Sequence, residues 1–199
     1  MSAVVTNIND LDVVNGIYRY ADYLLWKFQE RVELLKGKIF KMAAPSPTHQ
    51  EISGLLFVTL FAYFKDKKCK VYHAPFDVRL PRKNEKDEEI LTVLQPDLCV
   101  ICNPEKIDSR GCLGAPDLVV EILSPGNSQK ELDNKFRIYE EAGVAEYWIV
   151  DPEHEAVWVN VLRDGEYVTQ KPVAMGKTVT SVKFADLEIN TVDIFTKNN

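Results

Sequence analysis

The chain has 199 residues, of which 46% are apolar and 10% aromatic, enough for one packed core. A formal charge of −6 and a pI near 5.2 exclude a surface that is basic over its whole extent. The sequence shows no apolar stretch of the roughly 18 residues that a membrane span needs, and its start lacks the order of a signal peptide. We therefore expect a single cytoplasmic domain over residues 1–199, with no membrane partner.

Two predicted elements open the chain, and a predicted strand follows further on. Residues 18–30 are expected to form a short helix, and residues 31–42 a hairpin that turns at Lys36-Gly37. Residues 71–80 end in alternation between apolar and polar side chains, which predicts a half-exposed strand with Arg79 on its outer side.

Two helices are predicted from cap chemistry and from apolar residues at helical period. The first begins near Ser46-Pro47-Thr48, where Thr48 and Glu51 have the spacing of a capping box. In the second, Ser128 and Glu131 repeat that spacing, and Gly143 ends the helix.

The remaining apolar runs predict the central strands of a sheet. Residues 98–102 and 118–123 are short and rich in aliphatic side chains, as is typical of strands buried on both faces. Residues 144–150 predict another strand. Residues 157–162 and 167–169, separated by Asp164-Gly165, indicate a hairpin near the C-terminus.

The cysteines are too sparse for the disulfide framework of a secreted protein, and we interpret them as reduced thiols. They are Cys69, Cys99, Cys102 and Cys112. Cys99 and Cys102 have CxxC spacing, but positions i and i+3 of a strand face opposite sides of a sheet. A zinc site is therefore not expected.

Glu121 is the most informative residue, because it interrupts the apolar run 118–123. Burial of an unpaired charge costs several kcal/mol, on the order of the penalties for ions in protein interiors, so a partner is required. A buried ion pair or a protonated carboxyl would be sufficient for one isolated glutamate.

Asp97 provides a second carboxylate at the start of the preceding central strand. If the two strands are neighbours, Asp97 and Glu121 meet, and a cation between them would relieve their repulsion. Oxygen ligands favour Mg²⁺ or Mn²⁺ over zinc. Lys135 shares the inward stripe of its predicted helix with Phe136 and can reach the acidic pair. The alternative for Lys135 is an exposed pair with Glu131.

At this point the chain resembles the Uma-type putative restriction endonuclease family, within the PD-(D/E)XK nuclease superfamily. The resemblance covers about residues 18–196. The residues that carry it are Gly37 with 39–42, residues 46–52, Gln95-Pro96-Asp97-Leu98, residues 114–125, Asp133, Lys135 and residues 143–152.

This resemblance implies an α/β fold with an αβββαβ core, a mixed sheet flanked by helices, and extra β-hairpins towards both ends of the chain. It also implies that Asp97 and Glu121 hold Mg²⁺ (or Mn²⁺). Leu123 stands where the superfamily motif has lysine. Lys135 is the candidate for a lysine that has migrated to the adjacent helix.

Four further residues are weighed for the site. His49 lies near the inward side of its helix, where it can contact a phosphate or a metal-bound water. The alternative is a helix-terminal histidine with only a structural role. Glu51 is a capping residue by spacing, and the alternative is that it reaches the metal. Asp77 and Asp117 widen the acidic cluster, or Asp117 only orders its turn beside Pro116.

The expected function is a metal-dependent endonuclease that hydrolyses phosphodiester bonds in DNA, with Asp97, Glu121, Lys135 and His49 as its catalytic set. Cleavage of both strands favours a homodimer. The alternatives are an inactive nuclease-fold module that binds nucleic acid or serves a mobile element, and a structural domain in which Glu121 pairs with Lys135. Basic runs are candidates for DNA contacts or are solvated surface; they are Lys65, Lys67, Lys68 and Lys70, then Arg79, Arg82 and Lys83, then Lys130, Lys135 and Arg137.

Overall fold

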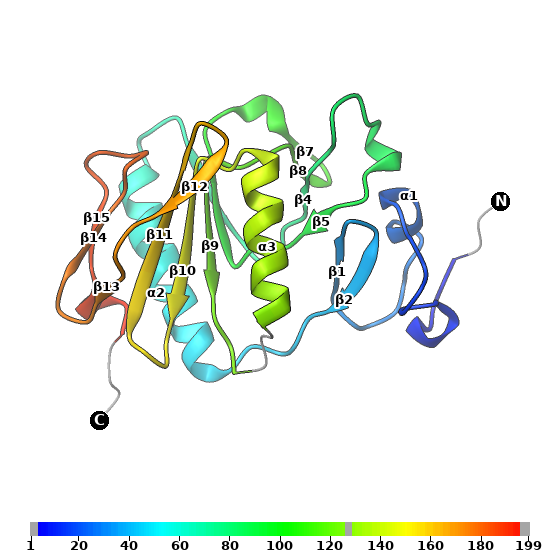
Figure 1. Ribbon diagram of the computed structural model, residues 1–199, viewed down its shortest axis with the longest axis horizontal. Coiled ribbons are helices and arrows are strands. Elements are labelled where there is room, and N and C mark those ends of the chain that lie inside the picture. Colours follow the sequence, from blue (N-terminus) through cyan, green and yellow to red (C-terminus); the bar gives the residue numbers. More distant parts are fainter. Residues whose placement is uncertain (1–3, 126–128, 196–199) are drawn as a thin grey trace.

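The structure is a computed structural model that describes residues 4–125 and 129–195 (Figure 1). Its α-helices are α1 (Tyr20–Tyr23), α2 (Pro47–Phe64) and α3 (Gln129–Ala142), and short 3₁₀ turns lie at Ile8–Asp10, Asp87–Glu89, Pro104–Lys106 and Thr191–Asp193. Within these described ranges, no helix combines the length and the apolar character needed to cross a membrane.

The largest sheet is built mainly from the second half of the chain, with two strands added from the segment 70–101. Its strand order is β12 (Glu166–Thr169), β11 (Ala156–Arg163), β10 (Glu146–Asp151), β9 (Leu118–Ile122), β6 (Leu98–Ile101) and β3 (Lys70–His73), with β13 (Val173–Ala174) also paired to β11. Strands β3, β6 and β9 are antiparallel neighbours, whereas β9 and β10 are parallel and joined through α3. The order α2, β3, β6, β9, α3, β10 is the predicted αβββαβ core.

A second sheet is built mainly from the first half of the chain. Its order is β2 (Lys38–Lys41), β1 (Val32–Leu35), β5 (Val93–Leu94), β4 (Val78–Arg79), β8 (Gly111–Leu113) and β7 (Ile107–Asp108). Near the C-terminus, β14 (Thr178–Thr180) pairs with β15 (Glu188–Asn190). In Figure 1, β1 and β2 lie on the side of α3 that faces the N-terminal segment.

Alternation along the central strands divides the core between the two long helices. Leu98 and Val120 pack with the buried face of α2, whereas Cys99 and Val119 pack with Tyr139 of α3. Figure 1 shows α2 behind the large sheet and α3 in front of it. Because side chains alternate between the faces of a strand, Glu121 lies on the α3 face with Val119.

The prediction of a single strand over residues 71–80 is wrong, because the structure has two separate strands there, β3 and β4. The chain leaves the large sheet after His73 and joins the other sheet at Val78, so β3 and β4 have different partners. Arg79 is fully buried and donates to Asp87 and Asp108 at 2.6 Å each. Arg79 is therefore a core ion-pair residue and is not available for a nucleic-acid surface.

The starts of the long helices differ in part from the predicted caps. Ser46 is the N-cap of α2, and its hydroxyl accepts a hydrogen bond from the backbone N–H of His49. The predicted Thr48–Glu51 capping box is therefore wrong, because Pro47 already occupies the first helical turn. The predicted cap Ser128 lies outside the described residues. Gly143 follows α3 with φ of 84°, as a helix-ending glycine does. The predicted helix at 18–30 is reduced to the single turn of α1.

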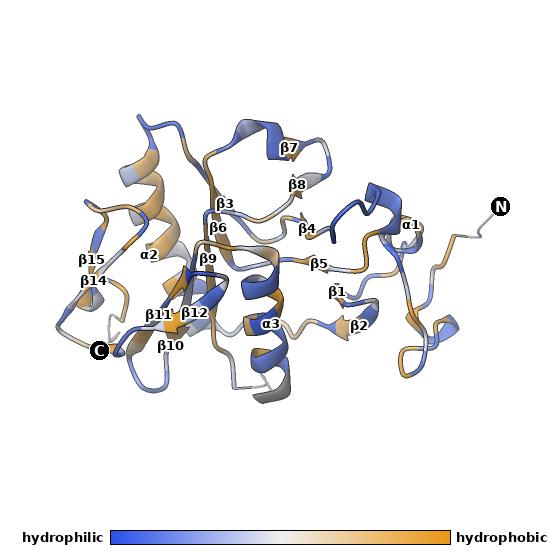
Figure 2. Ribbon diagram, turned by 45° about the horizontal axis from the view of Figure 1, so that its top comes forward, coloured by the Kyte–Doolittle hydropathy of each residue, from blue (hydrophilic) through white to orange (hydrophobic). Residues whose placement is uncertain are grey.

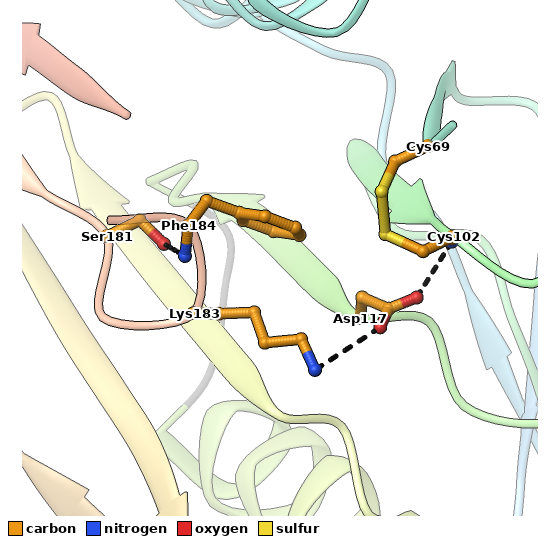
Figure 3. The surroundings of a disulfide bond; sticks show 6 residues. All are labelled: Cys69, Cys102, Asp117, Ser181, Lys183 and Phe184. Atoms are coloured by element: carbon orange, nitrogen blue, oxygen red, sulfur yellow. Dashed lines mark hydrogen bonds and ion pairs between the residues drawn. A yellow bond between two sulfur atoms is a disulfide. The ribbon is translucent and has the colours of Figure 1, made fainter. Parts of the chain in front are cut away.

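The cysteines are not all reduced thiols. Cys69 and Cys102 form a disulfide next to the pairing of β3 with β6 (Figure 3). Cys99 and Cys112 are free and buried. The pairing of Lys70 with Ile101 places the two cysteines directly opposite each other, one step beyond the ladder. Sequence spacing of 33 residues carried no sign of this proximity.

Candidate active site

The two predicted carboxylates lie opposite each other on neighbouring strands. Leu98 pairs with Val120 in the antiparallel ladder of β6 and β9, so Asp97 is opposite Glu121. The Oδ2 atom of Asp97 accepts the backbone N–H of Ile122 at 2.7 Å, which fixes the Asp97 carboxylate against β9. Both carboxylates line one pocket of about 180 Å³.

Lys135 reaches this pair from α3. Its Nζ lies 3.1 Å from both Glu121 carboxylate oxygens and 3.1 Å from Oε2 of Glu33. The hydroxyl of Tyr139, one turn further along α3, donates to Oε1 of Glu121 at 2.7 Å. Lys135 is only 6% exposed, so the alternative of an exposed pair with Glu131 is wrong.

Glu33 is a member of the site that the sequence analysis missed. It lies on β1, is 2% exposed, and accepts the backbone N–H of Gln95 at 2.8 Å. It interrupts the apolar run Val32–Leu35 in the same way that Glu121 interrupts β9. That interruption was the available signal, and it pointed to the same chemistry.

The buried site carries more negative than positive charge. Burial raises the pKa of Glu121 to about 7, and the nearby Asp97 and Glu33 add to this rise while Lys135 and Tyr139 oppose it. Burial alone would lower the pKa of Lys135, but Glu121 and Glu33 outweigh it and raise that pKa well above its usual value. The Lys135 ammonium therefore contacts two carboxylates, Glu121 and Glu33, with a third carboxylate, Asp97, close to Glu121, and an added cation would be attracted.

His49 completes the pocket from the first turn of α2. Its Nε2 is 3.2 Å from Oδ2 of Asp97, and the side chain is buried. Burial disfavours the charged ring, but the hydrogen bond to Asp97 and the charges of Asp97 and Glu121 raise the pKa of His49 above its ordinary value. Within the described chain, Nδ1 of His49 has no hydrogen-bond partner.

The residues present fit a hard divalent cation. Asp97 and Glu121 offer oxygen donors, which Mg²⁺ and Mn²⁺ prefer. Among the described residues, no cluster of three or more His, Cys, Asp and Glu side chains is arranged to enclose a metal. Mg²⁺ is commonly held by one or two carboxylates and keeps several waters, so two carboxylates in a polar pocket are an adequate donor set.

Basic and polar residues also line the pocket and extend it to the surface. Arg31 and Lys41 line it from the hairpin of β1 and β2, and exposed Gln50 lines it from α2. Leu123, which stands in the expected lysine position, also lines the pocket. Among the residues of the predicted basic runs whose side chains the structure describes, Lys135 alone lines the pocket.

Three acidic residues that the sequence offered as further candidates for the site are not among the pocket-lining residues. These are Glu51, Asp77 and Asp117. Asp117 lies beside the disulfide, where Oδ2 accepts the backbone N–H of Cys102 at 2.8 Å and Oδ1 is 3.5 Å from Nζ of Lys183 (Figure 3). Asp117 therefore orders its turn, as the alternative interpretation of this residue stated.

Asp77 belongs to a separate buried network. Its Oδ1 accepts the Tyr23 hydroxyl at 3.2 Å and the Gln95 side-chain amide at 2.8 Å. Burial raises the pKa of Asp77, and the hydrogen bonds from Gln95 and Tyr23 only partly offset that rise. The folded protein therefore binds the Asp77 proton more tightly than the unfolded chain does.

Asp77→Asn is expected to gain stability relative to the native protein as the pH rises. When the pKa of a carboxyl is higher in the folded protein, the free energy of unfolding falls as the pH rises from the unfolded pKa, about 3.9, to the folded pKa. Asn retains an oxygen acceptor and has no such loss. Urea unfolding at pH 3 and pH 7 measures the difference between variant and native free energies. Equal differences at the two pH values would contradict the assignment.

The αβββαβ core, with two carboxylates and a lysine in one pocket, defines the class of the protein as a nuclease-like α/β protein. Residues 20–192 match the Uma2 family, described as "Putative restriction endonuclease", and the chain belongs to this family. A crystal structure of "a putative nuclease belonging to DUF820" from Anabaena variabilis superposes with a TM-score of 0.70 at 19% identity. The match covers 89% of this chain and 97% of that one, and it shows the shared fold.

A curated relative gives no named activity. The chain is 28% identical to the uncharacterized protein slr1290 of Synechocystis sp. over 120 residues, and these residues cover 59% of this chain. The match spans 60% of the length of that relative.

Proposed function

We propose that the protein is a metal-dependent endonuclease that hydrolyses phosphodiester bonds in DNA. The observation that carries the proposal is the convergence of Asp97, Glu121 and Lys135 on one pocket that reaches the surface. A purely structural pair of Glu121 and Lys135 would be sealed from solvent, whereas here both residues line a pocket with exposed Lys41 and Gln50.

Each residue has a distinct role in this proposal. Asp97 and Glu121 would hold Mg²⁺ or Mn²⁺, which when bound supplies an activated water and polarises the phosphate. Lys135, itself a buried side chain, places a fixed positive charge where the reacting phosphate gains negative charge. His49 holds Asp97 by its Nε2 and orients that carboxylate.

DNA would be held by the basic rim of the pocket. Arg31 and Lys41 line the side formed by β1 and β2, where they can neutralise backbone phosphates without reading base sequence. A homodimer would bring two such pockets to the two strands of a duplex.

Lys41→Ala is expected to weaken DNA binding and to reduce its dependence on salt. Loss of one phosphate contact lowers the slope of log affinity against log salt by about 0.9. Fluorescence anisotropy with labelled duplex in EDTA measures this slope without cleavage. Lys68→Ala, an exposed lysine that is not among the pocket-lining residues, is the matched control and should retain the native slope. Equal slopes for Lys41→Ala and native protein would remove Lys41 from the DNA site.

A second candidate is an inactive nuclease-fold module that binds nucleic acid, and Leu123 in the lysine position favours it. Incubation of supercoiled plasmid with native protein separates the two candidates. Nicking that requires Mg²⁺ or Mn²⁺ and stops with EDTA supports the enzyme. Binding of the plasmid without nicking, in protein that is folded and supplied with metal, supports the module.

A further inference from the structure

Helix α2 is apolar on its inner face and also on the part of its outer face that runs from Gly54 to Ala62. Its inner stripe, with Ile52, Leu56, Leu60 and Phe64, is buried against the large sheet. Its outer stripe carries Val58, which is 65% exposed, and Phe61, which is 51% exposed. The ribbon of α2 in Figure 2 is coloured as hydrophobic along much of its length, whereas the ribbon of α3 is largely coloured as hydrophilic. Large apolar side chains that lie together on an exposed helix face commonly mark a surface that another protein covers.

Gly54 gives a second and independent indication. It lies in the middle of α2, where glycine weakens a helix relative to alanine. A Cβ atom at Gly54 would meet no described atom within 4 Å, so packing within the described chain does not require a glycine here. Glycine on an exposed helix face permits close approach of another backbone, which Gly54 would allow beside Val58.

The outer stripe is complementary to itself in the antiparallel direction. If two α2 helices cross with Val58 against Val58, Gly54 lies opposite Ala62 and Leu55 lies opposite Phe61. In the same register the exposed Glu51 lies opposite the exposed Lys65. Small residues thus meet small ones, large apolar residues meet each other, and opposite charges meet at both ends. An interface with a two-fold axis needs this reciprocity.

We propose that the outer face of α2 is the surface through which two copies of this chain pair, with their α2 helices antiparallel about Val58. We call this surface the α2 stripe, made of Glu51, Gly54, Leu55, Val58, Phe61, Ala62 and Lys65. The pairing adds the contact surface to the homodimer of the proposed function, and molecular mass tests it independently of cleavage.

The first test is the mass of the full chain in solution, measured by sedimentation velocity over a range of concentrations. Native protein is expected at twice 22.7 kDa. Val58→Lys places two ammonium groups together on the two-fold axis and should weaken pairing by at least about 30-fold. Val168→Lys alters a valine of β12 that is 52% exposed and is the matched control, expected to remain dimeric. A native monomer at every concentration, or a Val58→Lys dimer of native affinity, overturns the proposal.

Charge reversal tests the register. Glu51→Lys and Lys65→Glu should each weaken pairing, because each places like charges opposite one another. The double variant Glu51→Lys/Lys65→Glu restores opposite charges and should recover most of the native affinity. If the double variant loses as much pairing free energy as the two single variants together, the antiparallel register is wrong.

Gly54→Ala separates pairing from folding. Alanine favours the helix, so this change should raise the melting temperature of the monomeric Val58→Lys protein. In the native background the added methyl group should keep the helices apart and weaken pairing. A Gly54→Ala protein that pairs as tightly as the native protein contradicts the close approach at Gly54.

Discussion

Asp97→Asn is expected to lower the rate of plasmid cleavage by more than about a hundredfold, while Asp117→Asn retains a rate close to native. Loss of an outer-shell partner of a metal ligand already costs about 10- to 100-fold, and loss of a ligand charge should cost more. Asn keeps an oxygen that can accept the backbone N–H of Ile122, so the fold should persist. Timed nicking of supercoiled plasmid in Mg²⁺ measures both rates.

Asp117 is a close control because the chain repeats the same local chemistry. Both aspartates follow a proline and precede a leucine at the start of a central strand. Asp97 accepts the backbone N–H of Ile122 in β9, and Asp117 accepts that of Cys102, the residue after β6. Only Asp97 of the two lines the pocket. If Asp117→Asn lost activity as fully as Asp97→Asn while still folded, the cause would be a change in strand geometry that both variants share. That result would contradict the assignment of Asp97 as a metal ligand.

Lys135→Met is expected to lower the free energy of unfolding by about 3–5 kcal/mol, because it leaves Glu33 and Glu121 buried without their cation. It should also abolish cleavage. Urea unfolding followed by tryptophan fluorescence in EDTA measures the stability. Lys36→Met removes the exposed pair with Glu141, whose side chains are 45% and 58% exposed, and should cost less than about 1 kcal/mol.

A double-mutant cycle identifies the source of the Lys135 effect. Glu121→Gln in the Lys135→Met background removes a stranded charge, so the double variant should be less destabilised than the sum of the single variants. The coupling should lie in the range of about 0.5–3 kcal/mol found for residues in contact. Additive losses would show that Lys135 stabilises the fold by packing alone.

The core and the acidic pair were predictable because their signals are local. Apolar runs identified β6 and β9, and Glu121 is conspicuous in its run since a buried charge requires a partner. Adjacent strands then place Asp97 opposite Glu121. The position of Lys135 was predictable from the helical period, which placed it on the inward stripe of α3.

The missed features depend on contacts between distant segments. Arg79 resembles an outward strand residue until Asp87 and Asp108 are brought to it by folding. The Cys69–Cys102 disulfide follows from the register of β3 and β6, which spacing does not specify. Glu33 differs from these two, because the run Val32–Leu35 did carry its signal.

The most direct measurement is nicking of supercoiled plasmid in Mg²⁺ by native protein, Glu121→Gln and Lys135→Ala at matched purity and with folding verified. The predicted result is nicking by native protein that is lost in both variants. That outcome supports the metal site and the migrated lysine together. Native protein that is folded, supplied with metal and inactive, or variants that cut as well as native protein, would contradict the catalytic assignment of Glu121 and Lys135.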